Sequence, residues 1–190
     1  GFVVGDLEDL CGMRANPVSS IRLYDCRLPA ENLLGREGMG LKIGLAALDT
    51  GRMGIAAQSV GIAQAALEEG LLYAQQRRQF KVPICNHQAI QMMIADMGTL
   101  VEASRLMTYR AAAFRDSGKG FSQESAMAKL FASEACCKVT DLAVQIHGGY
   151  GYSKSYPVER YYRDARVTRI YEGSSEVHRM VIARGVMGKK

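Results

Sequence analysis

Apolar residues recur every three or four positions through most of this chain, and this spacing restricts its fold more than any other feature. In a first run they share one helix face: Ala56, Val60, Ala63, Leu67, Leu71 and Ala74. A second run holds Ile90, Ile94, Met97 and Val101 and continues to Phe114, and a third holds Met127, Phe131, Ala135, Val139, Leu142 and Ile146. Long amphipathic helices joined by short loops predict an antiparallel helical bundle.

Residues that stop or start helices separate these runs. Pro83 follows the first run, the loop RDSGKG follows the second, and HGGYG ends the third. Pro157 is expected to open a short fourth helix, and a fifth is expected from near Ser174 toward Gly185. The chain after Gly38 is therefore predicted to be almost entirely helical.

Residues 1–36 have a different pattern. In SSIRLYDCRLP, Ile21 and Leu23 alternate with Arg22 and Tyr24, which is typical of a strand. NP and LPAENLLG are turn signals. We expect residues 1–36 to be the end of a β-rich domain and residues 37–190 to be a helical domain. So short a β segment does not form a stable sheet by itself.

Composition excludes several classes of protein. No apolar run approaches the length of a transmembrane helix, and the first residues, which lack Met, do not form a signal peptide. The missing Met suggests that the chain begins inside a longer protein. Five cysteines without CxxC spacing argue against a zinc site and a disulfide framework. The net charge of +5 is mild and suits anionic small ligands as well as nucleic acid.

Glu172, in the segment RIYEGSSEV, is the first candidate catalytic residue. One interpretation is helix electrostatics, because a carboxylate is stabilised near a helix N-terminus. Glu176 also meets that need. The other interpretation is a general base, since Tyr171 offers an apolar wall and Gly173 leaves space for a ligand.

Other motifs also allow two interpretations. The segment QIHGGYGY, residues 145–152, is either a helix end with a connector or a place where a ligand approaches the backbone. Arginines recur every third residue in 160–169 and form either a solvated face or an anion site. Arg77 and Phe80 pair a cation with an aromatic ring. His147 and His178 lack a second ligand at a metal spacing and are interpreted as structural or solvent-facing. Cys136 and Cys137 are interpreted as small hydrophobic residues.

Taken together and in order, these motifs resemble the C-terminal portion of the acyl-CoA dehydrogenases, closest to the short-chain, butyryl-CoA-like members. The resemblance covers essentially the whole chain and rests on these segments: GRMGIAAQSVGIAQAALE, RRQF, MAKLFASEA, QIHGGYGY, YPVERYYRDARVTRIYEGSSEV and RMVIAR. It implies the last strands of a middle β domain, followed by a C-terminal antiparallel four-helix bundle.

The resemblance also implies a reaction. A glutamate removes the α-proton of an acyl-CoA thioester while a β-hydride passes to N5 of FAD, and the glutamate of the family's YEG motif is here Glu172. In the isovaleryl branch the base lies on the first long helix instead, so Glu172 argues against that branch.

Further site residues follow by motif position. The cofactor-binding residues implied are Arg77, Phe80, Gln145, His147, Gly148, Gly149, Gly151, Ser174 and Glu176. The substrate-binding residues implied are Asp49, Arg52 and Gly173, and no metal is implied. The family usually has Gly after the Phe of its RxxF motif, whereas this chain has Lys81.

The family implies a homotetramer in which Arg77 reaches a neighbour's flavin, an electron-transfer flavoprotein as partner, and a location in a bacterial cytoplasm or the mitochondrial matrix. Two alternatives stay within the superfamily, namely an acyl-CoA oxidase and a dehydrogenase of cyclic acyl-CoAs. A third is a non-catalytic helical module that binds nucleic acid or a partner, although no base-reading motif supports it. Chain length of the acyl group is not fixed by these residues.

Overall fold

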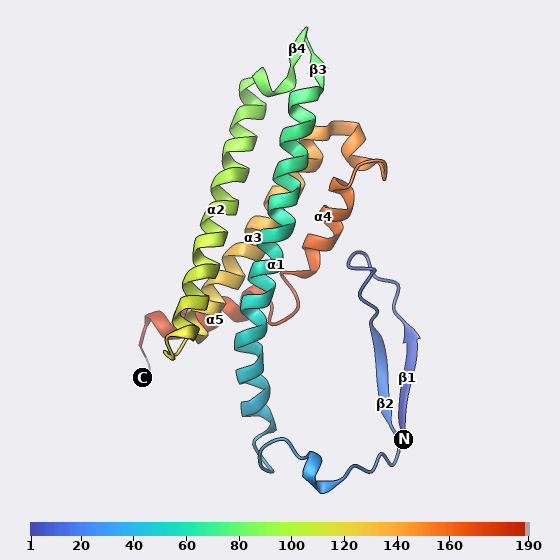
Figure 1. Cartoon of the computed structure of the whole chain (residues 1–190), viewed down its shortest axis with the longest axis vertical. Coiled ribbons are helices and arrows are strands. Elements are labelled where there is room, and N and C mark those ends of the chain that lie inside the picture. Colours follow the sequence, from blue (N-terminus) through green and yellow to red (C-terminus); the bar gives the residue numbers. More distant parts are fainter. Residues whose placement is uncertain (189–190) are drawn as a thin grey trace.

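Three long antiparallel helices form the body of the computed structural model, which describes residues 1–188 (Figure 1). They are α1 (Gly40–Gln76), α2 (Gln88–Asp116) and α3 (Ser122–His147). At about 1.5 Å per residue, the 37 residues of α1 extend for roughly 55 Å. The ends of all three helices agree with the stop signals in the sequence, so the predicted mostly helical class is confirmed.

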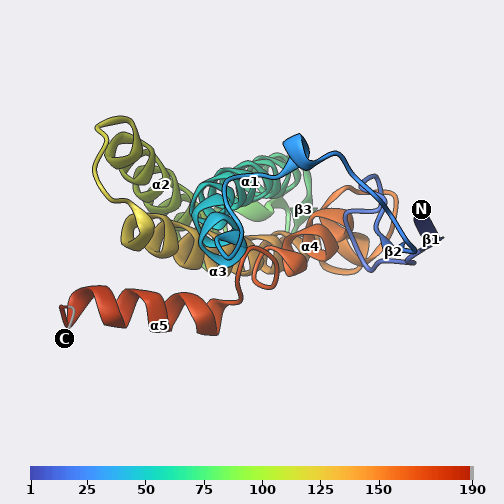
Figure 2. The same ribbon diagram turned by 90° about the horizontal axis from the view of Figure 1, so that it is seen from below.

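Two shorter helices complete the bundle by packing on α3. They are α4 (Val158–Val167), which begins after Pro157, and α5 (Ser175–Val186), which begins after Ser174. The fourth side of the bundle is thus divided between two helices, with α5 lying across the far side of α3 from α1 and α2 (Figure 2). Three short 3-10 turns lie in the connections: η1 (Ala30–Asn32), η2 (Ile84–Asn86) and η3 (Gly148–Tyr152).

The N-terminal segment forms an antiparallel hairpin of β1 (Phe2–Leu7) and β2 (Ser19–Leu23), with Val4 opposite Ile21. Its apolar side chains are exposed, as Ile21 and Leu23 are 59% and 65% accessible. The hairpin touches the helices through its connecting loop, where the Met13 N–H donates to Asp164 Oδ1 at 2.6 Å and Arg163 donates to the Cys11 carbonyl. This arrangement fits the predicted strands, which lack a sheet to join.

Small residues fill the core between the helices. Of the predicted α1 face, Ala56, Val60, Ala63 and Ala74 are buried, whereas Leu71 is 38% exposed. On α3 the prediction found Ala135, Val139 and Ile146 but missed a buried row of smaller side chains, while Met127, Phe131 and Leu142 are only half-buried. Alanines and serines face the neighbouring helices because the helix backbones approach closely there.

A tight hairpin of β3 (Arg78–Gln79) and β4 (Val82–Pro83) caps the far end of α1. Its two turn residues, Phe80 and Lys81, both have positive φ angles, of 52° and 72°. Two left-handed residues in a two-residue turn match the twist of the strands.

Among residues 1–188, no helix combines the length and the apolarity needed to cross a membrane. The five cysteines are free thiols, and Cys136 is fully buried. Within the same part of the chain, no cluster of His, Cys, Asp and Glu side chains could hold a metal ion.

Candidate functional site

Glu172 lies in the turn between α4 and α5. It has a φ angle of +54°, and Gly173 after it has +98°, so the chain reverses in two left-handed residues. Ser174 then caps α5 by accepting from the Val177 N–H at 3.5 Å. Before the turn, the Tyr171 hydroxyl donates to Gln58 Oε1 at 2.7 Å and fastens the segment to α1.

The Glu172 carboxylate lies directly against α1 at Gly51. A Cβ atom on Gly51 would overlap Glu172 Oε2 and would lie 2.8 Å from the carboxyl carbon. Only glycine at position 51 leaves room for the Glu172 carboxylate in this place, because any larger residue would displace it. Residues 1–188 give this carboxylate no ion pair, and it is only partly buried.

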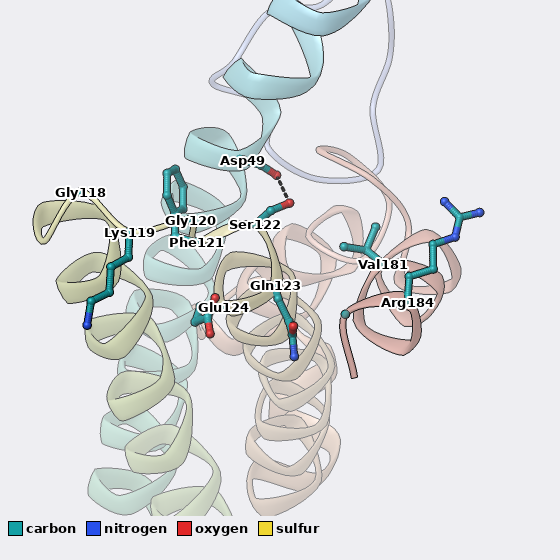
Figure 3. A pocket seen from close by; sticks show the side chains of 11 residues that line it. Asp49, Gly118, Lys119, Gly120, Phe121, Ser122, Gln123, Glu124, Val181 and Arg184 are labelled. Carbon is teal, nitrogen blue, oxygen red and sulfur yellow. Dashed lines mark hydrogen bonds between the residues drawn. The ribbon is translucent and has the colours of Figure 1, made fainter. Parts of the chain in front are cut away.

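The predicted substrate residues lie beside Gly51 on the same helix. Arg52 is 5% exposed and forms an ion pair with Asp49 at 2.5 Å, while its buried Nε atom has no hydrogen-bond partner in the part of the chain that the structure describes. Asp49 also accepts from the Ser122 hydroxyl at 3.0 Å (Figure 3). The structure thus brings Asp49, Arg52 and the base candidate to one end of the bundle.

A groove of about 800 Å³ adjoins Asp49. Its walls are the loop between α2 and α3, the first turn of α3 and the second half of α5 (Figure 3). Lys119 and Arg184 stand at its two sides, and Glu124 is its second carboxylate. Its cations, together with its open shape, suit a long ligand that carries negative charge.

Two buried bases lie beneath the Glu172 turn. Lys129 on α3 is fully buried, and its Nζ donates to the Gly173 carbonyl at 2.7 Å. Burial, with Arg52 nearby, lowers the pKa of Lys129 to about 8. The ring of His178 is also fully buried and packs on Gly173. Burial, followed by the Lys129 and Arg52 charges, lowers the pKa of His178 to about 4. The complete burial of the ring agrees with the structural interpretation of this residue and not with the solvent-facing one.

A second cluster lies at the C-terminal end of α1 and contains several of the predicted cofactor-binding residues. A groove of about 600 Å³ there is lined by Arg77, His147, Gly148 and Gly149 together with neighbouring side chains. His147 stacks on Tyr73 with ring centroids 4.2 Å apart.

The His147 ring has one free nitrogen. Its Nδ1 atom lies 2.8 Å from the Ala143 carbonyl oxygen, and its buried Nε2 has no hydrogen-bond partner among the described residues 1–188. Burial lowers the pKa of His147, so the neutral ring is favoured. Because Nδ1 donates to a carbonyl, Nε2 of the neutral ring is an acceptor and suits a hydroxyl group, such as that of a ribose. The Arg77 cation at the same groove suits a phosphate, so the two residues together fit a dinucleotide.

The remaining predicted residues of this cluster have separate places. Gly148 has a φ angle of +60° and ends α3. Gly151 is buried so close to α3 that a Cβ there would overlap the Val144 carbonyl. Gln145 is exposed, and Phe80 is 87% exposed at the tip of the β3–β4 hairpin. Neither lines the groove.

Residues 51 and 77 are about 39 Å apart along α1 at 1.5 Å per residue. The Glu172 cluster, which includes the predicted Gly173, Ser174 and Glu176, is therefore separate from the Arg77 groove. Hydrogen bonding from Ser174 lowers the pKa of Glu176, an exposed carboxylate in the first turn of α5.

Sequence reasoning missed Lys129, and it noticed Gly51 only as a small residue. A charged residue within the apolar run of α3, followed by alanines and serines, is the one signal that could have singled out Lys129. The contact of Gly51 with Glu172 joins segments far apart in the chain and has no local signal.

Comparison with known proteins agrees with this geometry. The family model for the acyl-CoA dehydrogenase C-terminal domain matches residues 38–187. The chain is 52% identical over 187 residues to an acryloyl-CoA reductase (NADH) of Anaerotignum propionicum, which covers 98% of this chain and 48% of that protein. It is 51% identical over 183 residues to the mitochondrial short-chain specific acyl-CoA dehydrogenase of Rattus norvegicus, covering 96% of this chain and 44% of that one.

Solved structures give the same result. The butyryl-CoA dehydrogenase of Megasphaera elsdenii superposes with a TM-score of 0.97 at 46% identity, over 99% of this chain and 49% of that chain. The chain thus spans about half the length of the relatives it matches. From the family model, the identities and the superposition together, the chain belongs to the acyl-CoA dehydrogenases, a family of oxidoreductases.

Proposed function

We propose that this chain carries the base of an FAD-dependent α,β-dehydrogenation of acyl-CoA thioesters, and that Glu172 is that base. One observation supports this most. The left-handed turn holds the Glu172 carboxylate against Gly51 without an ion-pair partner in residues 1–188. A carboxylate without an ion-pair partner, placed by a left-handed turn, suits proton abstraction, whereas a carboxylate that only stabilises a helix needs no such turn.

In this proposal the thioester lies over Gly51 and Gly173, and Glu172 takes the proton from the α-carbon. FAD, when bound, supplies the acceptor for the β-hydride. The α-proton of a thioester is weakly acidic, so the carboxylate must stand within hydrogen-bond reach of it. Because Arg52 pairs with Asp49 on the same helix, its guanidinium is engaged there and does not form an ion pair with the base among residues 1–188.

The groove beside Asp49 is proposed to receive the CoA portion of the substrate. Lys119 and Arg184 lie at its two sides and suit phosphate groups. We further propose a short acyl chain, on the similarity to short-chain relatives.

The Arg77 groove is proposed to contact FAD bound mainly by a neighbouring subunit. Its distance of about 39 Å from Gly51, at about 1.5 Å per residue, exceeds the reach of one dinucleotide that also presents its flavin to Glu172. A related Bacillus anthracis acyl-CoA dehydrogenase was solved in complex with FAD. A homotetramer follows as a proposal, because each site then needs residues from two copies.

An electron-transfer flavoprotein is the proposed electron partner, since one relative is a subunit of a caffeyl-CoA reductase-Etf complex. The names of that relative and of the acryloyl-CoA reductase favour a second candidate function, which is the reverse reaction, namely the reduction of an enoyl-CoA to the saturated acyl-CoA. Its proton step uses the same carboxylate in the opposite direction. Bacterial cytoplasm or the mitochondrial matrix is the proposed location, in line with the sources of the relatives.

The proposal is tested by Glu172→Gln in the FAD-loaded enzyme. We expect butyryl-CoA binding to be unchanged and anaerobic flavin reduction to slow by at least about 10²-fold, since general base catalysis contributes that much or more. Absorbance at the flavin band follows reduction directly. The matched control is Glu102→Gln, which changes an exposed carboxylate on α2 that belongs to neither proposed site.

Each result has one meaning. Unchanged reduction by Glu172→Gln moves the base elsewhere. A wild-type protein that binds FAD but is not bleached by acyl-CoAs, yet is reoxidised by crotonyl-CoA after chemical reduction, identifies the reductase direction. Rapid reoxidation by O₂ identifies an oxidase.

A further inference from the structure

Among residues 1–188, Lys129 is the largest side chain that is completely buried, and the proposed reaction gives it no role. An ammonium group inside a protein is strongly destabilising unless it is paired or hydrogen-bonded. Its Nζ donates to the Gly173 carbonyl at 2.7 Å, and no carboxylate of residues 1–188 forms an ion pair with it. The ammonium group is thus hydrogen-bonded to the backbone of the residue that immediately follows Glu172.

Gly173 is also held from its other side. The His178 ring packs so closely that a Cβ on Gly173 would lie 3.1 Å from its Cε1 atom. Within residues 1–188, neither ring nitrogen has a geometric hydrogen-bond partner, and burial lowers the pKa of the ring, so it packs on Gly173 in its neutral form. Lys129 and His178 therefore fix the peptide after Glu172 in place, while Gly51 limits where the carboxylate can lie.

We propose that Lys129 is a positioning residue for the base: its ammonium holds the Gly173 carbonyl, and so fixes the left-handed turn that presents the Glu172 carboxylate at Gly51. This proposal rests on the proposed function of Glu172. Lys129 reaches the reaction only through the turn and through its charge, so it is not itself catalytic.

The charge of Lys129 adds a pH signature to this role. The titratable and charged groups that act on it are Arg52 from α1, Glu134 from α3, Glu172 from the turn, and Glu176 and His178 from α5. Burial and Arg52 favour the neutral amine, and the three carboxylates favour the ammonium. Because the pKa of Lys129 is lowered to about 8, the ammonium predominates at neutral pH and loses its proton as the pH rises through about 8. Flavin reduction in the wild type should then decline above about pH 8 as the hold on Gly173 weakens.

The test compares three variants of the FAD-loaded enzyme by stopped-flow reduction with butyryl-CoA between pH 6 and pH 9. Lys129→Met keeps the length of the side chain but removes both the donor and the charge, and Lys129→Gln keeps an amide donor only. Lys138→Met is the matched control, because Lys138 is an exposed lysine on the same helix. We expect Lys129→Met to slow reduction by about 10²-fold, the usual effect of misplacing a reacting group by 1 Å, with butyryl-CoA affinity unchanged.

The pH profile separates positioning from simple destabilisation. Lys129→Met should lack the decline above pH 8, and Lys129→Gln should recover part of the rate at all pH values while also lacking that decline. Amide hydrogen exchange supplies a measurement that does not depend on activity. Residues 171–175 should exchange faster in Lys129→Met than in Lys138→Met, whether or not FAD is reduced.

The outcomes are distinct. Wild-type rates, pH profile and exchange in both Lys129 variants would overturn the positioning role. A wild-type enzyme that is not reduced by any acyl-CoA would overturn the proposed function instead, and the exchange measurement would still decide whether Lys129 holds the turn. If Lys129→Met does not fold, the shorter donor in Lys129→Gln decides the question by the same two measurements.

Discussion

At the scale of single residues, the most informative position is Gly51, because the absence of a side chain there is what the Glu172 carboxylate uses. A methyl group at position 51 would meet only the flexible end of Glu172. We therefore expect Gly51→Ala to change the placement of the carboxylate and to leave the fold intact. Catalysis and stability should respond in opposite directions.

For Gly51→Ala we expect flavin reduction to slow by about 10²-fold, with the free energy of unfolding raised by roughly 0.5–1 kcal/mol through helix propensity. Gly61→Ala is the control, since a Cβ there meets open space on the same helix. It should gain the same stability without losing rate. Stopped-flow reduction and urea denaturation measure the two effects, and a normal rate in Gly51→Ala would mean that the carboxylate does not act from this position.

Gly173 is a residue whose backbone, rather than its size alone, is essential. Its φ angle of +98° is strained for any L side chain, and a Cβ would press on the His178 ring. Gly173→Ala should lower the free energy of unfolding by about 1–3 kcal/mol, as measured by urea denaturation. Gly98→Ala on α2, where space is open and φ is ordinary, should be neutral or slightly stabilising; equal effects from both would show that the turn is not strained.

At the scale of elements, the β3–β4 hairpin departs from the pattern of its family in one position. Lys81 has a φ angle of +72°, which Gly adopts without strain, and its carbonyl accepts from the Arg78 guanidinium at 2.7 Å. Lys81→Gly should stabilise the protein by about 0.5–1 kcal/mol, because relief of a left-handed residue outweighs the added freedom of Gly. Calorimetry against Lys154→Gly, a loop lysine without a positive φ, tests this; a lower melting temperature for Lys81→Gly would contradict it.

How far the sequence predicts the elements follows from the range of the interactions involved. Pro83, Pro157 and the glycines around residue 148 act locally, so the ends of the helices were predictable. The buried face of α3 was only partly predictable, because hydrophobic spacing selects large residues whereas closely packed helices bury Ala, Ser and Cys. The motif singled out Glu172, whose role stays a prediction. The contact of Glu172 with Gly51 and that of Gly173 with Lys129 cross between segments far apart in the chain and could not be predicted.

At the scale of the whole molecule, buried His178 links stability to pH. Its pKa is lowered from 6.5 to about 4 in the folded state, so the unfolded state takes up the proton first as the pH falls. Stability is therefore complete above pH 6.5 and declines between 6.5 and 4, by at most about 1.4 kcal/mol per pH unit. His147, whose pKa is also lowered, acts in the same direction.

His178→Gln should flatten this decline, although its stability at pH 7.5 should be lower because the ring no longer packs on Gly173. Melting temperatures of the wild type and the variant between pH 4 and pH 8 provide the measurement. Parallel curves for the two proteins would show that His178 is not the group that titrates.

The length of α1 has a consequence for heredity. It sets Glu172 and Arg77 at opposite ends of each copy, so in the proposed assembly one flavin site takes its base from one copy and its arginine from another. In a mixed pair of a Glu172→Gln copy and an Arg77→Ala copy, one site bears both defects and the other bears neither. Random co-assembly of two inactive products should thus restore roughly a quarter of the sites. Two damaged alleles of a single gene would then complement each other. Such complementation would not occur if each copy built a complete site from its own residues.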